Sequence, residues 1–196
     1  SGGHTILTLV KDNSTYKVLG KTLDDSAGEV FDKVARHLGL PYPGGPEISK
    51  ASSKTNRSSY KFPRPMIKTN CYNFSFSGLK THVTQLINKT ELSDLLISDI
   101  AYDFENAIID VLITKTLRAA REHNIENIVI AGGVSANKKL RARCDIEKGE
   151  KKIFFPDMAY STDNGAMIAY MGWLKSSKVS VNNSLEINPN PSSRFI

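Results

Sequence analysis

Two glycine pairs lie beside short apolar runs and could hold an anion. The first pair, within residues 1–3, precedes a strand expected over 5–10, and the second, at 132–133, follows the apolar run 127–131. Glycine lets backbone N–H groups approach a phosphate closely, and a helix expected from Ser135 would direct its partly positive amino end to the same place. The second pair therefore favours phosphate binding slightly over plain packing. The first pair, taken alone, favours an ordinary tight turn.

Asp163 lies where a loop is expected to close onto the last long helix, predicted over 163–174. A carboxylate there can cap the helix or bind a divalent metal, because hard and borderline cations accept carboxylate oxygen. One carboxylate is not a metal site, and the four histidines of the chain show no paired spacing. Alone, Asp163 favours a helix cap; as a metal ligand it requires further ligands from elsewhere.

Two further polar residues could bind a nucleoside. Asn137 lies in the expected first turn after the second glycine pair, where its amide could reach a ribose or a base. Asp32 lies off the apolar stripe of a helix predicted to begin after residues 24–26 and to end at Gly39. A carboxylate that binds ribose is common in nucleotide sites, although a solvated surface position is the default for a residue such as Asp32.

A basic stretch separates Glu47 from Glu91, with no Asp or Glu between them and with eight Lys and Arg residues. Aromatic residues are interleaved with these cations. Such a surface would attract a phosphate backbone, but a solvated basic face whose aromatic residues belong to the core explains the pattern equally well. The candidates for nucleic-acid contact are Lys50, Lys54, Arg57, Lys61 and Arg64.

Composition limits the class of protein. The chain has 196 residues, of which 40% are hydrophobic and 23% charged, with a net charge of +6. These values predict a globular chain and exclude collagen, a coiled coil and wholesale disorder. No apolar stretch approaches the roughly 20 residues that cross a bilayer. The two cysteines form neither a disulfide framework nor a metal-ligand pair.

The expected elements follow the order β-β, a helical insert, β, then α-β-α-β-α. We expect no regular structure over 41–46, because this segment holds three prolines and two glycines, and we expect a strand over 72–76. An apolar stripe predicts a helix through 97–112 that ends near His123, and the last strand is expected over 153–155. This order predicts an α/β fold with a mixed sheet flanked by helices, as in the ribonuclease-H-like lobes of actin, hexokinases and Hsp70 chaperones.

Seven motifs of the sequence resemble, in the same order, those of the TsaD family of tRNA threonylcarbamoyladenosine transferases, once described as O-sialoglycoprotein endopeptidases. They are Ser1-Gly2-Gly3-His4-Thr5, Asp24-Asp25-Ser26-Ala27-Gly28-Glu29, Tyr42-Pro43-Gly44-Gly45-Pro46, Phe62-Pro63-Arg64-Pro65-Met66, Asn73-Phe74-Ser75-Phe76-Ser77-Gly78-Leu79-Lys80-Thr81, Ala131-Gly132-Gly133-Val134-Ser135-Ala136-Asn137 and Thr162-Asp163-Asn164-Gly165-Ala166-Met167. The resemblance runs from residue 1 to about residue 175. It is closer to the bacterial branch, with its mitochondrial relatives, than to the archaeal one.

The resemblance implies a two-lobed fold of the actin-like ATPase (ASKHA) superfamily, of which this chain is the carboxyl-terminal lobe with a helical insert. The first hairpin would span 1–23, the helical and loop insert 24–70, the remainder of the lobe 71–179 and an irregular tail 180–196. The first lobe is expected upstream.

The resemblance also implies an acyltransferase that moves a threonylcarbamoyl group from threonylcarbamoyl-adenylate to N6 of the adenosine beside the tRNA anticodon. The residues that match the adenylate-binding positions of the family are Ser1, Gly2, Gly3, Asp32, Gly45 and Asn137. Asp163 matches a ligand of one divalent metal, iron or zinc, whose other protein ligands are two histidines of a His-x-x-x-His motif in the first lobe. Because that motif is absent from this sequence, we expect the fragment alone to be inactive. No protein nucleophile is needed, since AMP is a good leaving group, and no general base is assigned.

Partners and location are expected from the same resemblance. Family members act on tRNA together with a non-catalytic paralogue and a small P-loop ATPase, or as homodimers in mitochondria. We expect no membrane partner, and a cytoplasmic location in a bacterium or, alternatively, the mitochondrial matrix. Two other functions stay open from the residues alone: an ATP-dependent kinase or ATPase of the same superfold, and a non-catalytic paralogue that serves dimerisation.

Overall fold

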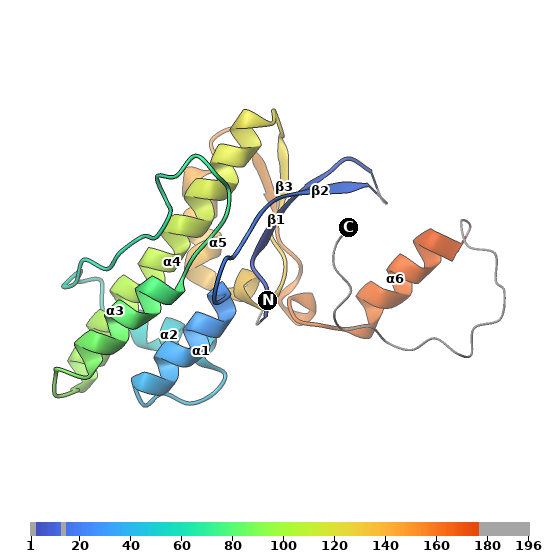
Figure 1. Ribbon diagram of the computed structural model, residues 1–196. Coiled ribbons are helices and arrows are strands. Elements are labelled where there is room, and N and C mark those ends of the chain that lie inside the picture. Colours follow the sequence, from blue (N-terminus) through green and yellow to red (C-terminus); the bar gives the residue numbers. More distant parts are fainter. Residues whose placement is uncertain (1–2, 13–14, 177–196) are drawn as a thin grey trace.

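The computed structural model describes residues 3–12 and 15–176. Within them the chain forms four strands, six α-helices and two short 3₁₀-helices (Figure 1). The elements are β1 (Ile6–Val10), β2 (Tyr16–Lys21), α1 (Ala27–His37), α2 (Gly44–Ser52), α3 (Ser77–Ile87), α4 (Asp94–Glu122), β3 (Asn127–Val129), η1 (Gly133–Ala136), α5 (Lys138–Glu147), β4 (Lys152–Phe154), η2 (Met158–Tyr160) and α6 (Gly165–Ser176). The predicted site residues Ser1 and Gly2 and the predicted tail over 180–196 lie outside the described residues.

The strands form two small sheets. β1 and β2 pair as an antiparallel hairpin, with a register shift between Leu7 and Thr8. β3 and β4 pair in parallel and are joined by the crossover helix α5, as a parallel pair requires. The mixed α/β class predicted from the sequence is confirmed. Within the described ranges the two strand pairs are not joined into one sheet. Residues of β1 and β3 line an apolar groove.

The longest helix, α4, connects two apolar clusters. One cluster lies between α4 and the helices α1, α2 and α3, and the other lies between α4, β3 and α5. In the first, the ring of Phe104 meets that of Phe31 edge to face, with ring centroids 5.4 Å apart. α4 begins after Ser93, which accepts the N–H of Leu96 at 3.3 Å, and it ends next to His123, as its apolar stripe predicts.

α1 begins and ends where the sequence predicts. Ser26 accepts the N–H of Glu29 at 3.2 Å, and the Glu29 carboxylate accepts the N–H of Ser26 at 3.5 Å. This reciprocal pair is a capping box. Gly39 follows the last turn with φ +71°, the left-handed conformation that commonly ends a helix. Local sequence signals are therefore sufficient to define this helix.

The prediction of irregular structure over 41–46 is wrong, because α2 begins at Gly44. Pro46 stands in the first turn, where its missing N–H would have no partner within the helix in any case. The N–H of Gly44 is bound instead by the carboxylate of Asp32, 2.8 Å away. Burial of Ile48 in the cluster between α1, α2 and α4 then stabilises a helix that has low intrinsic propensity.

The prediction of a strand over 72–76 is also wrong, although Phe74 and Phe76 are both buried, as their alternation suggests. In this segment the structure shows one isolated bridge, between Phe74 and Thr22. The N–H of Phe76 donates to the carboxylate of Asp24 at 2.7 Å. A side chain thus takes the place of the next strand partner, and α3 begins directly afterwards.

The last helix, α6, lies apart from the rest of the described chain (Figure 1). It begins at Gly165, two residues after the predicted start, because Asn164 accepts the N–H of Met167 at 3.1 Å and so caps it. Several of its large apolar side chains are exposed, including Trp173. Among the described residues, no helix combines the length and the apolar character that a bilayer span requires.

Asp25 connects α1 to α3. Its carboxylate accepts hydrogen bonds from the ammonium groups of Lys33, at 3.0 Å, and Lys80, at 2.5 Å. Burial raises the pKa of Asp25, but hydrogen bonds from Lys80, Lys33 and Ser77 outweigh it and lower the pKa from 3.8 to about 2. The folded protein therefore favours the charged form of this carboxylate.

We expect Asp25→Asn to remove stability that depends on pH. A carboxylate whose pKa falls from 3.8 to about 2 on folding contributes stability above the higher value, and that stability is lost as the pH falls towards the lower one. Urea midpoints of wild type and variant should thus differ above about pH 4 and converge towards about pH 2. The exposed Asp145 supplies the control Asp145→Asn. A difference between wild type and Asp25→Asn that stays constant across this range would contradict the assignment.

Candidate nucleotide-binding site

The second glycine pair lies between β3 and α5, as the sequence predicts. Gly132 has φ +89°, a conformation that strains residues with a side chain. The next four residues form η1, and α5 begins at Lys138 rather than at the predicted Ser135. The later start follows from the cap, because the side chain of Asn137 accepts the N–H of Leu140 at 2.8 Å. A strand, a glycine turn and a capped helix thus follow one another.

The side chain of Asn137 also makes contacts outside its own helix. Its Nδ2 donates to Oε1 of Glu105 at 2.7 Å and to Oγ of Ser49 at 3.0 Å. Both N–H groups and one lone pair of Oδ1 are then used within the chain. Contact of Asn137 with a ribose or a base stays a prediction, and in this geometry its side chain would act through the remaining lone pair of Oδ1.

Glu105 is the centre of this cluster, and none of the sequence motifs singles it out. Its side chain is 1% exposed, accepts the Ser49 hydroxyl at 2.6 Å and lies 3.0 Å from the ammonium group of Lys139. Burial raises the pKa of Glu105, but hydrogen bonds from Ser49 and Ser52 and the charge of Lys139 outweigh it, so the pKa lies below its ordinary value. The carboxylate is therefore charged at neutral pH and held by donors from two other helices.

Asp32 binds the amino end of α2, in the helical turn that also holds Gly45. One carboxylate oxygen of Asp32 accepts the N–H of Gly44 at 2.8 Å. A Cβ at Gly44 would lie 2.6 Å from that of Ala35 and 2.7 Å from Cα of Asp32, so α1 and α2 approach each other through this glycine. A Cβ at Gly45 would meet nothing within 4 Å. Packing therefore requires a glycine at position 44 but not at position 45.

The structure brings Asn137 close to this end of α2. Ser49, which contacts Asn137, follows Gly45 by one helical turn on the same face of α2. The next turn carries Ser52, whose hydroxyl accepts from Lys139 at 2.8 Å. Three predicted adenylate contacts, at positions 32, 45 and 137, thus belong to one hydrogen-bonded assembly of α1, α2 and α5.

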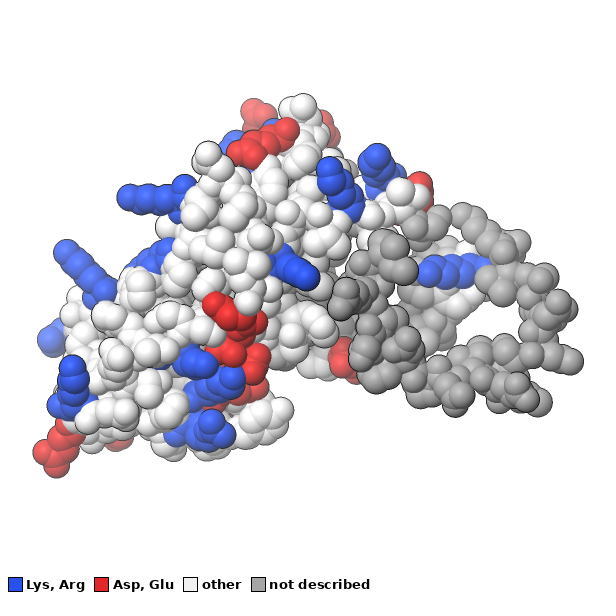
Figure 2. Space-filling model, in the orientation of Figure 1, with Lys and Arg blue, Asp and Glu red and all other residues white. Residues whose placement is uncertain are grey.

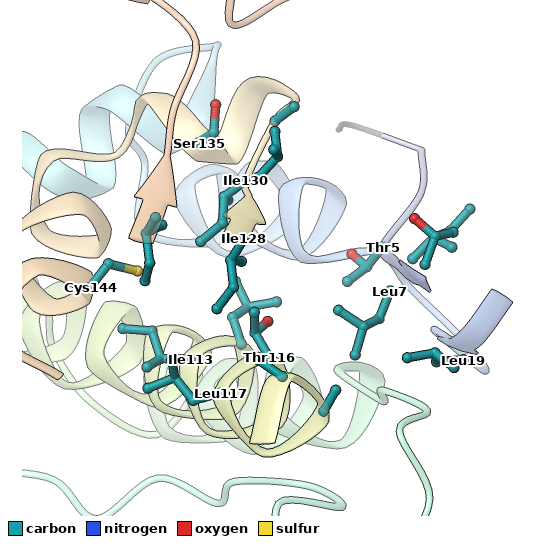
Figure 3. Close-up of a pocket in the computed structure, with 18 of the residues that line it drawn as sticks. Thr5, Leu7, Leu19, Ile113, Thr116, Leu117, Ile128, Ile130, Ser135 and Cys144 are labelled. Atoms are coloured by element: carbon teal, nitrogen blue, oxygen red, sulfur yellow. The ribbon is translucent and has the colours of Figure 1, made fainter. Parts of the chain in front are cut away.

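The strand β1, the strand β3 and the residues on either side of the second glycine pair line a common groove of about 530 Å³. Figure 3 shows Thr5 and Leu7 of the first hairpin facing Ile128 of β3 across it. The lining is mostly apolar, and Ser135 contributes a buried hydroxyl that has no hydrogen-bond partner among the described residues. Of the first glycine pair, Gly3 is described and exposed. Its contact with an adenylate stays a prediction.

Asp163 does not cap α6, since Asn164 does. Its side chain is exposed, and no described residue donates a hydrogen bond to it or pairs with it. In residues 3–12 and 15–176 no group of three His, Cys, Asp or Glu side chains gathers in a way that could hold a metal ion. Asp163 is thus available as one ligand, and the other ligands of such a metal would have to come from beyond this part of the chain.

The two arginines of the basic stretch lie beside acids of α4, and one of them is held firmly. Arg64 donates to Asp110 through Nε at 3.0 Å and pairs with it through Nη2 at 2.9 Å. The Nε of Arg57 lies 3.7 Å from Asp99, but the Arg57 side chain is 77% exposed, so this pair holds it only weakly. The stretch itself holds no acid, but the fold places acids against it. Part of its positive charge is therefore neutralised within the chain.

The lysines of the stretch resemble Arg57 and differ from Arg64. Lys50, Lys54 and Lys61 are exposed, and the ammonium group of Lys50 lies 3.8 Å from Glu47. Figure 2 shows Lys and Arg side chains projecting from the helical end of the molecule, with acidic side chains between them. The exposed positive charge of the stretch is therefore carried by these lysines and by Arg57. Contact of these residues with tRNA stays a prediction.

A parallel strand pair with a glycine turn that opens a helix, beside the glycine end of a second helix, is typical of α/β lobes that bind phosphate-containing ligands. A family model agrees with this class. The model described as "TsaD: tRNA N6-adenosine threonylcarbamoyltransferase" matches residues 1–170. The chain belongs to this family, and the resemblance seen in the seven motifs is confirmed.

Curated relatives carry the same description. The tRNA N6-adenosine threonylcarbamoyltransferase of Thermosipho africanus is 48% identical over 193 residues, which cover 97% of this chain and 58% of the relative. That of Ralstonia pickettii is 47% identical over 183 residues, 89% of this chain and 52% of the relative. That of Fervidobacterium nodosum is 44% identical over 196 residues, 97% of this chain and 58% of the relative. The chain spans just over half the length of these relatives.

We expect Gly44→Ala to destabilise the protein by about 1–3 kcal/mol, because the added methyl must push α1 away from α2. Gly45→Ala is the matched control in the same helical turn, where the methyl meets nothing and the helix propensity rises. Urea midpoints of the two variants should differ clearly. Equal midpoints would show that the close approach of the two helices is not maintained in solution.

Proposed function

We propose that the full-length protein transfers a threonylcarbamoyl group from threonylcarbamoyl-adenylate to N6 of the adenosine beside the tRNA anticodon. The observation that carries the proposal is the family match over residues 1–170. Relatives at 44–48% identity, all described as tRNA N6-adenosine threonylcarbamoyltransferases, support it. Because the chain spans just over half of those relatives, its part in the reaction would be the adenylate-binding lobe.

The adenylate is assigned to the region between the glycine turn and the amino end of α2. Helix amino ends and glycine turns present N–H groups to phosphate. Gly45 leaves room beside Asp32, whose second carboxylate oxygen accepts no hydrogen bond from a described residue and could bind a ribose hydroxyl. The residues proposed to bind the adenylate are Ser1, Gly2, Gly3, Asp32, Gly45 and Asn137.

The reaction breaks the bond between the carbamoyl carbon and the adenylate oxygen, forms a bond from that carbon to N6, and releases AMP and the N6 proton. Because AMP leaves readily, the residues of this lobe would contribute chiefly by holding the phosphate and the nucleoside in place. A divalent metal, iron or zinc, bound by Asp163 and two upstream histidines, would supply Lewis-acid stabilisation of developing negative charge. No side chain of the described residues is assigned as a general base.

We also propose the setting in which the protein works. The partners would be tRNA and either a non-catalytic paralogue with a small P-loop ATPase or a second copy of the protein. The relatives named above are bacterial, which supports a bacterial cytoplasm over the mitochondrial matrix.

In the full-length protein, Asp163→Ala should remove most of the bound metal and lower the transfer rate by roughly 10²-fold, the scale of losing one electrostatic stabiliser of the transition state. Metal content and incorporation of labelled threonine into tRNA would be measured together. Asp157→Ala removes a nearby exposed acid that caps η2 and should leave both readouts unchanged. If Asp163→Ala keeps its metal and its rate, the metal role is wrong.

Replacing Lys50, Lys54 and Lys61 by Glu should weaken tRNA binding by about tenfold or more at moderate salt, since each lysine near a phosphate contributes to counterion release. The slope of log affinity against log salt should become shallower by about 0.7–0.9 for each phosphate that a lysine no longer neutralises. Adenylate affinity should change by less than about twofold, because these lysines lie outside the proposed adenylate site.

The matched control for these lysines replaces Lys11, Lys17 and Lys21 of the first hairpin by Glu, with the same change in net charge. All three are exposed. Filter binding over a range of salt concentrations distinguishes a local surface from a general effect of charge. Equal losses of affinity in the two triple variants would rule out the basic stretch as the tRNA-binding surface.

A further inference from the structure

Two buried carboxylates lie two residues apart on α4, and they bind different parts of the chain. Asp103 is 3% exposed and accepts the hydroxyl of Ser58 and the N–H groups of Ser59 and Tyr60 at 2.7–2.8 Å. It therefore holds the loop that follows α2. Glu105 is equally buried but faces α2 and α5. Asp103 can therefore serve as a control for Glu105, because both acids are buried on α4 but contact different parts of the chain.

The contacts of Glu105 close a small ring. Asn137 donates to both Glu105 and Ser49, and Ser49 donates to the same carboxylate oxygen of Glu105. The other carboxylate oxygen lies 3.0 Å from the ammonium group of Lys139, which also lies 3.9 Å from the centroid of the Tyr102 ring. Hydrogen bonds linked in this way strengthen one another in a buried setting.

The ring joins the two parts of the chain between which the adenylate is assigned. Asn137 and Lys139 follow the glycine turn after the short helix η1, and Ser49 lies one helical turn after Gly45. Without the carboxylate, Nδ2 of Asn137 and the Lys139 ammonium group would be deprived of a shared buried acceptor. Because Asn137 and Lys139 are only half-buried, these groups would turn to water, and the start of α5 would no longer be held against α2.

We propose that Glu105 is a positioning residue for adenylate binding, which fixes the glycine turn against the amino half of α2 through Asn137 and Lys139. The inference rests on the proposed function, because it assumes that the adenylate lies between these two elements. Glu105 itself touches no ligand and acts through the residues that it holds.

The test uses full-length protein carrying Glu105→Ala, with Asp103→Ala as the matched control. Hydrogen–deuterium exchange without ligand should rise over 132–140 in the first variant and over 58–60 in the second. Titration calorimetry with AMP should show affinity weakened about tenfold by Glu105→Ala, equivalent to the ordering of one or two side chains. The effect of Asp103→Ala should stay within about twofold. Glu105→Gln keeps an oxygen that can accept from Ser49 and Asn137 and should restore most of the affinity.

A milder variant guards against loss of folding. Ser49→Ala removes one member of the ring without leaving a buried charge alone, and it should weaken AMP binding by about threefold with raised exchange over 132–140. Unchanged AMP affinity in Ser49→Ala and Glu105→Ala, or equal losses in Glu105→Ala and Asp103→Ala, would overturn the positioning role. A wild-type protein that binds no AMP would overturn the proposed function itself, and the positioning role with it. Exchange is measured without ligand, so it reports whether Glu105 holds residues 132–140 in place even if AMP does not bind. AMP binding by the wild type reports on the proposed function separately.

Discussion

A carboxylate that lies out of water must be matched by donors, and Glu105 is matched by groups from α2 and α5. Three helices that are distant in sequence therefore meet at a single buried charge. Two predicted nucleotide contacts depend on this meeting point, because Asn137 touches Glu105 directly and Gly45 precedes Ser49 by one turn. Apolar packing alone would allow α2 and α5 to slide, whereas hydrogen bonds to one charged group fix their relative position.

Helix α4, which carries Glu105, also explains why the basic stretch between Glu47 and Glu91 is less available to a polyanion than its composition suggests. α4 presents Asp99, Asp103 and Asp110 along the side that the stretch covers, and these acids bind Arg57, backbone N–H groups and Arg64. Arg64, with its planar set of donors, attaches the loop to the helix through Asp110. Arg57 and the exposed lysines face solvent, where a polyanion could reach them.

Sequence reasoning succeeds where the signal is local and fails where a distant side chain decides the structure. The capping box of Ser26 and Glu29 and the left-handed Gly39 define α1 within a few neighbouring residues. α2 could not be predicted in this way, because its first N–H is bound by Asp32 of another helix. Glu105 did leave a signal: it follows Ala101 by four residues and precedes Ile108 by three, so it lies on the apolar face of its helix.

Two glycines of the site are required by the fold, whereas two others are not and could instead serve a ligand. Gly132 is required by its backbone conformation, and Gly44 by the close contact of α1 with α2. Gly45 and Gly133 meet neither condition, since a Cβ at either position would contact nothing within 4 Å and neither has a positive φ. These two glycines stand at the amino ends of α2 and η1, where free N–H groups are available. A residue without a side chain at such positions gives an anion access to the backbone, which is the property that an adenylate phosphate needs.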